Sequence, residues 1–501
     1  MSSAKRLLRR RLPCRYRPIL RTMSTRIAVA LWGTLVLAGC AGLPAAAPEP
    51  RPVLALPDRW QATLPHGGTL AELGRWWSQF DDPLLERVVG AAQSASPTIA
   101  SAASRIEQAR STRTAAGAAL LPALDANASA ARGVQDVMLP HGTSASIGLQ
   151  ASWELDLFGR RRAARDAADA RLEGADAAWH DARVAVAAET ASQYVELRGC
   201  EALLAQARLE ANSRAETARL TDLSMRSGFE SRANASLAVA SAAQTRAAVA
   251  QQAARCDQIV KALVALTAVD EPALRTLLGT NTARVPQPAA IAVPNVPADA
   301  LAQRPDVLAS SRDVAAASAD VSESEAARWP RIALAGSIGA QRFEAGGTRL
   351  DGTTWSIGPV SVSLPIFDGG ARRANVTAAR ARYDAAVVSY GAALRNAVRD
   401  VESALIALQA SAERRADAQT AADNFDAYTR ATEARYRSGL GSLFELEDAR
   451  RSAFVAQNVL IDLRRDQVAA WIALYRALGG GWTAPADAAL ATAAEPSGQP
   501  K

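Results

Sequence analysis

ASIGLQASWELDL, residues 145–157, alternates apolar and polar side chains along its whole length. In an extended strand, this period of two places every apolar side chain on one face and every polar side chain on the other. The stretch has 13 residues, about the length of a tilted strand that crosses a membrane. It therefore predicts a membrane-type strand over about residues 145–158.

A second copy of this unit follows about 210 residues later in the chain. Each copy runs from a strand region into an Ala/Arg/Glu-rich segment that ends at an Arg-Ser-Gly turn. Three unlike landmarks keep nearly one offset: 208 residues from Pro122 to Pro330, 209 from Phe158 to Phe367, and 211 from Gly228 to Gly439. Because such an offset is the signature of an internal repeat, we infer a duplicated structural unit.

The duplication predicts four strands in the chain. Weaker alternating stretches at about 123–132 and 331–342 precede the two strong ones, and the second strong strand covers about 355–367. The links at about 133–144 and 343–354 are rich in Gly and polar residues, so we expect exposed loops there.

The last predicted strand contains a break in its alternation. Trp355 and Ile357 are out of phase with Val360 and Val362. Since an inserted residue changes the phase of a strand, a bulge is expected near Gly358-Pro359.

Four strands cannot close a barrel, and an open sheet cannot stay in hydrocarbon, where every backbone N–H and C=O needs a partner. Either the strands are soluble, or several chains combine them. Three chains would contribute twelve strands, a number within the range of outer-membrane barrels.

Two very long helices favour the second alternative. No proline occurs between Pro140 and Pro272, or between Pro365 and Pro485, so residues 160–227 and 371–438 are each predicted as one helix. A helix of that length spans roughly 100 Å. Each helix breaks at Gly228 or Gly439 and returns, and a shorter helix over about 97–120 stops before Pro122. The repeated unit is thus a long helical hairpin attached to a membrane-type β-hairpin.

The basic net charge of +7 comes from the N-terminal segment. Residues 1–39 contain nine Lys/Arg and no Asp/Glu, and the rest of the chain carries 48 basic and 50 acidic residues. The positive charge expected of a nucleic-acid-binding surface is therefore missing outside the leader, and no nucleic-acid partner is expected.

Residues 1–39 are predicted to be a secretion signal. The apolar core, 27–37, is too short to span a bilayer. Leu37-Ala38-Gly39-Cys40 resembles the bacterial lipobox, which implies cleavage before Cys40 and a covalent lipid on its thiol. Ala41, in place of Asp, favours delivery to the outer membrane. An ordinary signal peptide is the alternative, and translation could also begin at Met23.

The predicted organisation follows from these features. It comprises a signal peptide over 1–39, a lipid-anchored tether over 40–75, a first repeat over 76–280, a linker over 281–300, a second repeat over 301–480 and a tail over 481–501.

Several motifs in this order resemble the TolC/OprM-type outer-membrane efflux factors, and most closely their lipoprotein, NodT-like branch. They are the lipobox, the opening WWSQFDDPLL over 76–85, LAQRPDV over 301–307 and the two Gly turns. A departure is Ser96-Pro97, where the family often has Asn-Pro.

The resemblance implies a homotrimer with a 12-stranded outer-membrane barrel that continues as an α-helical tunnel across the periplasm. It implies a duct that exports drugs or other small toxic compounds, with a periplasmic membrane-fusion adaptor and an inner-membrane resistance-nodulation-division pump beneath it. Outer-membrane lipid would surround the barrel. Ducts for type I protein secretion or heavy-metal export are the alternatives within this class.

The resemblance also implies a gate after the second turn. Glu445 and Asp448 match acidic residues of the family's closed entrance, and their i, i+3 spacing puts them on one helix face. In a trimer they would form two stacked acidic rings that favour cations. Phe444 could plug this entrance, while Arg437 and Arg450 could lock it through ion pairs. Solvated surface charge and ordinary packing are the alternatives.

The two turns resemble the family's adaptor-contact motif. The residues concerned are Ser227, Gly228, Phe229, Ser438, Gly439 and Leu440. Glycine is also needed simply to make the turn, since it adopts positive φ without strain.

Cys200 and Cys256 lie at equal distances from the first turn, 28 residues before and 28 after Gly228. In a hairpin they would stand at one height on neighbouring helices. Because the periplasm is oxidising, we expect a disulfide that braces the first hairpin and leaves the second freer to open. Two buried free thiols are the alternative.

No feature of the chain indicates an enzyme. The three histidines, His66, His141 and His180, lack metal-ligand spacing, and no phosphate loop or nucleophile motif is present. Apart from the lipid, no cofactor or metal is expected. A structural periplasmic coiled-coil lipoprotein is the alternative outside the duct class, but it leaves the alternating strands unexplained.

Overall fold

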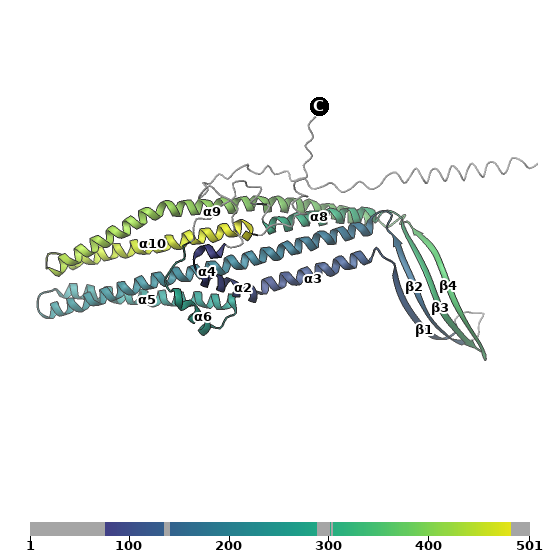
Figure 1. Cartoon of the computed structure of the whole chain (residues 1–501), viewed down its shortest axis with the longest axis horizontal. Helices are drawn as coiled ribbons and strands as arrows, with labels where there is room; N and C mark the ends of the chain where they lie inside the picture. The colour runs from purple at the N-terminus through teal and green to yellow at the C-terminus, as the bar shows by residue number, and fades with distance from the viewer. Residues whose placement is uncertain (1–75, 135–140, 288–300, 302–303, 482–501) are drawn as a thin grey trace, which may run out of the picture.

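The computed structural model describes residues 76–134, 141–287, 301 and 304–481. The predicted signal peptide, Cys40 and the tether therefore lie outside the described residues, as do residues 288–300 of the linker and 482–501 of the tail. Two long helical hairpins lie side by side, and a curved sheet continues from the end opposite their tips (Figure 1).

The hairpins confirm the predicted helices. The first consists of α4 (Arg160–Arg226) and α5 (Arg232–Thr267), and the second of α9 (Ala371–Arg437) and α10 (Leu443–Ala477). α4 and α9 contain 67 residues each, or roughly 100 Å of helix. The other described helices are η3 (Trp77–Phe80), α2 (Pro83–Ala95), α3 (Pro97–Ala118), α6 (Glu271–Leu278), η4 (Gly279–Asn281), α8 (Pro305–Ala326) and η5 (Gly479–Gly481).

Both long helices begin directly beneath the sheet, and an aspartate caps each of them. The Asp156 carboxylate accepts the backbone N–H groups of Arg161 and Arg162, each at 2.9 Å. Asp368 accepts those of Gly370 at 2.9 Å and Arg372 at 3.1 Å. A carboxylate that accepts the free N–H groups of a first turn fixes the helix start, so the strand-to-helix junction is defined in both copies.

The main core lies midway along the hairpins, where α2, α4, α5, α9 and α10 meet. Trp76 is fully buried there, 5.4 Å from the Tyr475 ring. The Tyr194 hydroxyl donates to the Asp82 carboxylate at 2.5 Å, and burial raises the pKa of Tyr194, so the hydroxyl stays protonated. Arg198 is also buried and donates to the Leu278 carbonyl at 2.9 Å. These bonded polar groups fix the region from which both hairpins project.

Four antiparallel strands form the sheet in the order β1-β2-β3-β4. They are β1 (Ala123–Gly133), β2 (Gly142–Leu155), β3 (Arg331–Ala345) and β4 (Thr348–Ser363). All four predicted strands are thus present, and β2 pairs with β3 across the two repeats. The strongly alternating stretch forms β2, which ends at Leu155 instead of about residue 158.

The register places apolar and polar side chains on opposite faces. Leu149, Ile338 and Trp355 are direct partners in one row, and residues opposite one another share a face. The apolar face defined by this register contains Ile147, Leu149, Trp153, Ile332, Leu334, Ile338, Trp355, Ile357, Val360 and Val362. The polar face carries Ser129–Ser146 and Ser337–Ser356 hydroxyl contacts, each 2.8 Å long.

A bulge keeps the last strand in phase, as predicted. Leu334 pairs with Val360 and Gly336 with Ile357, so Gly358 and Pro359 stand opposite Ala335 alone. This irregularity rotates the alternation and returns Val360 to the apolar face.

The predicted loop over 343–354 is wrong. β3 continues to Ala345 and β4 begins at Thr348, so only Gly346 and Gly347 connect them, with φ of 57° and 85°. Two glycines at positive φ make the tight turn that suits a twisted hairpin. The composition indicated a loop because most residues of this stretch are polar or glycine, although Phe343 and Leu350 pair within it. The other predicted loop, 133–144, is also shorter, and its residues 135–140 lie outside the described part.

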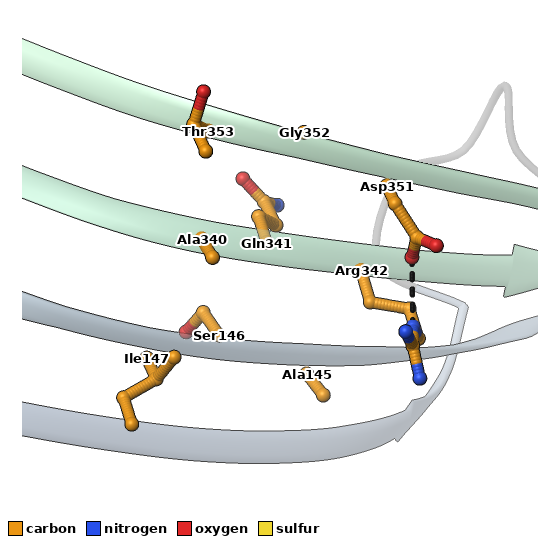
Figure 2. A pocket seen from close by; sticks show the side chains of 9 residues that line it. All are labelled: Ala145, Ser146, Ile147, Ala340, Gln341, Arg342, Asp351, Gly352 and Thr353. Carbon is orange, nitrogen blue, oxygen red and sulfur yellow. Dashed lines mark hydrogen bonds and ion pairs between the residues drawn. The ribbon is translucent and has the colours of Figure 1, made fainter.

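Toward the turn, the apolar face gives way to a hollow of mixed lining, where Ile147 and Ala340 lie near polar and charged side chains (Figure 2). Arg342 of β3 donates to Asp351 of β4 at 2.7 Å, and Thr353 lies one row further in. Of the helices in the described ranges, not one has the length and apolarity to cross a bilayer.

Candidate functional site at the hairpin tips

The two tips lie together at the end of the molecule opposite the sheet (Figure 1). Gly228 and Gly439 have φ of 79° and 77°, which a side chain would disfavour. The next residues, Phe229 and Leu440, close the turns through backbone bonds of 2.9 Å. Their side chains are 87% and 74% exposed, so each tip presents an apolar side chain outward.

Ser227 and Ser438 complete the six predicted tip residues, as the C-caps of α4 and α9. The Ser438 hydroxyl donates to carbonyls of its own helix at 3.0 Å. The Ser438 hydroxyl therefore stabilises its turn, and the exposed apolar side chains remain the candidates for contact with a partner.

Glu445 and Asp448 are both exposed on the first turns of α10, as is Phe444. The Glu445 carboxylate accepts the backbone N–H of Ser442 at 3.3 Å, and the Ser442 hydroxyl accepts the N–H of Glu445 at 3.1 Å. This capping box gives Glu445 a structural role at the helix start. Asp448 pairs with exposed Arg451 at 3.4 Å.

Arg437 and Arg450 occupy different environments. Arg437 is exposed and pairs with Glu433 on its own helix at 2.9 Å. Arg450 is only 7% exposed, and it donates to the Thr217 hydroxyl of α4 at 2.5 Å and to Glu433 at 3.1 Å. Arg450 therefore connects the two hairpins, whereas Arg437 does not.

Sequence reasoning missed the central residue of this contact, Glu447, which is 6% exposed. Its carboxylate accepts from Arg214 of α4 and, at 2.9 Å, from the Ser241 hydroxyl of α5. It also lies 3.5 Å from Arg450. The sequence signal that could have identified Glu447 is its position on the face of α10 that also carries Leu443 and Leu446, both buried.

We call this cluster the inter-hairpin latch, which consists of Arg214, Thr217, Ser241, Glu433, Glu447 and Arg450. Its cross-hairpin contacts are those of Glu447 with Arg214 and Ser241 and of Arg450 with Thr217. Removing one partner of a buried ion pair costs about 3–5 kcal/mol, because a charge is left without compensation. The latch can therefore hold the hairpins together near their tips.

Cys200 of α4 and Cys256 of α5 are joined by a disulfide, with Cα atoms 5.6 Å apart. Both residues are buried at the edge of the main core. Gln252 of α5 adds a bond of 3.2 Å to the Cys200 carbonyl. The first hairpin is thus crosslinked at the height that its sequence spacing predicts.

This bond makes a direct prediction for the protein in solution. After denaturation without reductant, a thiol reagent should label neither Cys200 nor Cys256, and reduction should make both reactive, because only the crosslinked sulfurs are protected. Peptide mass analysis assigns the label to each site. Labelling of both residues before reduction would refute the bond.

The described residues hold no group of three His, Cys, Asp or Glu side chains placed to bind a metal ion. The arrangement instead combines a strand sheet with one apolar face, a long helical body and a charged contact between hairpins.

Known proteins share this architecture. The sequence profile described as outer membrane efflux protein matches residues 88–269 and 296–480. The chain is similar to outer membrane protein OprJ of Pseudomonas aeruginosa, with 31% identity over 462 residues, 90% of this chain and 95% of OprJ. It is also similar to the solvent efflux pump outer membrane protein SrpC of Pseudomonas putida, with 29% identity over 469 residues, 91% of this chain and 98% of SrpC.

Solved structures agree with this similarity. A membrane protein from Pseudomonas aeruginosa superposes with a TM-score of 0.76 at 29% identity, covering 87% of this chain and 98% of that one. The outer-membrane channel OprN superposes with a TM-score of 0.75 at 28% identity, covering 88% and 96%. The profile match, the relatives and the shared fold together place this chain in the outer membrane efflux protein family.

Proposed function

We propose that this outer-membrane efflux channel is the exit duct for small apolar toxic compounds, and that the inter-hairpin latch closes its periplasmic entrance. The observation that carries the proposal is buried Glu447, which binds both helices of the other hairpin close to the tips. The names of relatives described as solvent and toluene efflux pump proteins favour this substrate class.

Three chains contribute the twelve strands of the barrel, with the apolar face toward lipid and the polar face toward the lumen. The helical hairpins continue this barrel as a tunnel into the periplasm. The sheet and the tips lie at opposite ends of the chain (Figure 1), so the tips form the periplasmic entrance.

The latch can separate without leaving Arg214 or Arg450 unpaired, because each has a second carboxylate partner. Arg214 also pairs with Glu210 on its own helix at 2.5 Å, and Arg450 pairs with Glu433 of its own hairpin. If α10 moves away from α4, each arginine keeps a carboxylate within its hairpin. Since uncompensated buried charge is the main cost of breaking such contacts, this arrangement favours a two-state entrance over a permanent seal.

Exposed acidic residues would act next to the latch. Glu445 and Asp448 are exposed on α10, and a trimer would repeat each of them three times around its axis. Rings of carboxylates favour cations in a water-filled pore. We assign them to ion preference at the entrance, with Phe444 as an apolar plug beside them.

We further propose the partners that such a duct requires. The exposed Phe229 and Leu440 side chains at the tips would contact a periplasmic membrane-fusion adaptor, which connects the duct to an inner-membrane resistance-nodulation-division pump. Cys40 would carry the lipid that anchors the chain, and the lipobox supports this assignment.

Deletion of the gene tests the function. Sensitivity to organic solvents, dyes and apolar antibiotics should rise, because these compounds would lose their exit route, and the parent chain should restore resistance. Growth inhibition across a panel of drugs, metals and solvents is the measurement. Loss of metal tolerance alone, or of one secreted protein alone, would instead identify a metal-export or type I secretion duct.

A further inference from the structure

The face of the sheet that carries the apolar rows continues toward the turn as two charged rows. In the first of them, Arg342 of β3 stands opposite Asp351 of β4. The second row lies closer to the turn and contains Arg132 of β1, Glu344 of β3 and Arg349 of β4. We call these five residues the charged rim. Since it combines three arginines with two carboxylates, the rim keeps a net positive charge in each chain, which attracts anions.

The apolar rows fix the height of the charged rim in the membrane. Ten residue steps of β3 separate Ile332, where the apolar face begins, from Arg342, which is about 33 Å of strand. At a strand tilt of about 40°, this corresponds to about 25 Å along the membrane normal, the height of the apolar band of an outer-membrane barrel. At the helix end of the sheet, the stacked Phe158 and Trp329 rings, 5.5 Å apart, are typical of the aromatic girdle at the inner boundary. The rim therefore lies in the hydrated headgroup layer of the outer leaflet.

One carboxylate aligns two arginines of the rim. Arg342 donates through Nε to Oδ1 of Asp351 at 2.7 Å, and Arg349 donates through Nε to Oδ2 of the same residue at 3.1 Å. Both arginine side chains are about half exposed, at 53% and 54%. Because these bonds with Asp351 use Nε, they leave the terminal N–H groups of both guanidiniums to a ligand. Arginine presents its donors in a planar fork that matches the oxygens of a phosphate.

A hollow lies beside the rim on its membrane side (Figure 2). Ala145, opposite Arg342, and Ala340, in the next row, contribute small side chains to it. Ile147 and Thr353 flank Ala340 in its row. The small side chains leave room against the sheet for a hydrocarbon chain, directly below the aligned arginines. The site thus suits a molecule that carries both a phosphate and an acyl chain.

A phosphomonoester is the anion that this geometry favours. It carries about two negative charges and three acceptor oxygens, whereas a phosphodiester has fewer of both. Two aligned guanidiniums can donate to several oxygens of one such group at once, and charge-assisted bonds of this kind are stronger than bonds between neutral groups.

We propose that Arg342 and Arg349, held together by Asp351, bind the phosphomonoester of an outer-leaflet lipid, and that the hollow receives one of its acyl chains. The trimer would carry three such sites around the outer rim of its barrel. The inference rests on the proposed function for the assignment of the apolar face to lipid.

Lipid binding to purified full-length trimers tests the site. The probe is lipid A, a glucosamine lipid with two phosphomonoesters, and it is compared with the same lipid after removal of both phosphates. Native mass spectrometry counts the lipids bound per trimer over a concentration series. The test variant carries Arg342→Ala and Arg349→Ala. The matched control carries Arg110→Ala and Arg219→Ala, which remove two exposed arginines from α3 and α4.

The parent should bind the phosphorylated lipid about 10-fold more tightly than the dephosphorylated one, and the test variant should lose this difference, because each charge-assisted contact contributes about a factor of 10. The matched control should behave like the parent. Arg342→Lys with Arg349→Lys should bind less tightly than the parent, since lysine keeps the charge but not the fork. Ala340→Phe, which fills the hollow, should weaken binding of both lipids.

Two results would overturn the inference. One is equal binding of the phosphorylated lipid by the parent and the test variant. The other is complete displacement of the lipid by inorganic phosphate at an equal concentration, which would identify a site for the free anion. Both leave the assignment of the faces standing. That assignment is tested separately by arginine substitutions at Ile338 and Ser337, and equal trimer assembly of those two variants would overturn it together with this inference.

Discussion

Ile338→Arg should abolish trimer assembly in the outer membrane, whereas Ser337→Arg should leave it intact. The two residues are neighbours on β3, but Ile338 stands in the row with Leu149 and Trp355 on the apolar face. Ser337 bonds to Ser356 on the polar face. An arginine toward lipid near the middle of a barrel wall costs about 2–4 kcal/mol in each chain, while an arginine in a water-filled lumen costs little.

The measurement is the fraction of heat-modifiable trimer in isolated outer membranes. Both substitutions introduce the same charged side chain at adjacent positions of one strand, so the added charge is the same in the two variants and the face toward which it points differs. Equal assembly of the two variants would contradict the assignment of the faces.

The strands illustrate how far the sequence predicts this fold. Alternation identifies β2 and the bulge within β4, because lipid on one side and water on the other impose a period of two. Alternation no longer predicts the strands beyond the apolar rows, because water lies on both sides of the sheet there. There the Gly346-Gly347 turn was the remaining signal, and the surrounding polar residues obscured it.

The helices were predictable for a different reason. Long stretches without proline end at Gly228 and Gly439, and equal spacing about the first glycine places Cys200 beside Cys256. These are properties of a single hairpin, so local sequence contains them.

Contacts between hairpins are not local, and the latch was therefore only partly predictable. Glu445, Glu447 and Asp448 look alike in sequence, yet only Glu447 is buried. Its partner Arg214 lies 233 residues away, and no spacing rule connects them. The resemblance to the family directed attention to the exposed acids, whereas the structure identifies the buried one.

Glu447→Ala should make the channel leak. The substitution removes the contacts that α10 makes with Arg214 and Ser241 and leaves the Arg450–Thr217 bond as the one cross-hairpin contact of the latch. We expect the closed state to lose about 3 kcal/mol, at the lower end for a buried pair because each arginine keeps a second carboxylate. The closed–open equilibrium then shifts about 100-fold. Conductance in planar bilayers and sensitivity to antibiotics too large for ordinary porins should both rise.

Three substitutions separate the latch from general loss of charge. Glu216→Ala removes an exposed partner of Arg219 on α4 and should change neither conductance nor sensitivity, since exposed pairs contribute little. Glu445→Ala with Asp448→Ala should alter cation preference more than the closed fraction, because both carboxylates are exposed and make no contact across the latch. If the conductance of Glu447→Ala were as low as that of Glu216→Ala, the entrance would have to be closed by contacts between chains. The buried carboxylate would then serve only to pack the two hairpins.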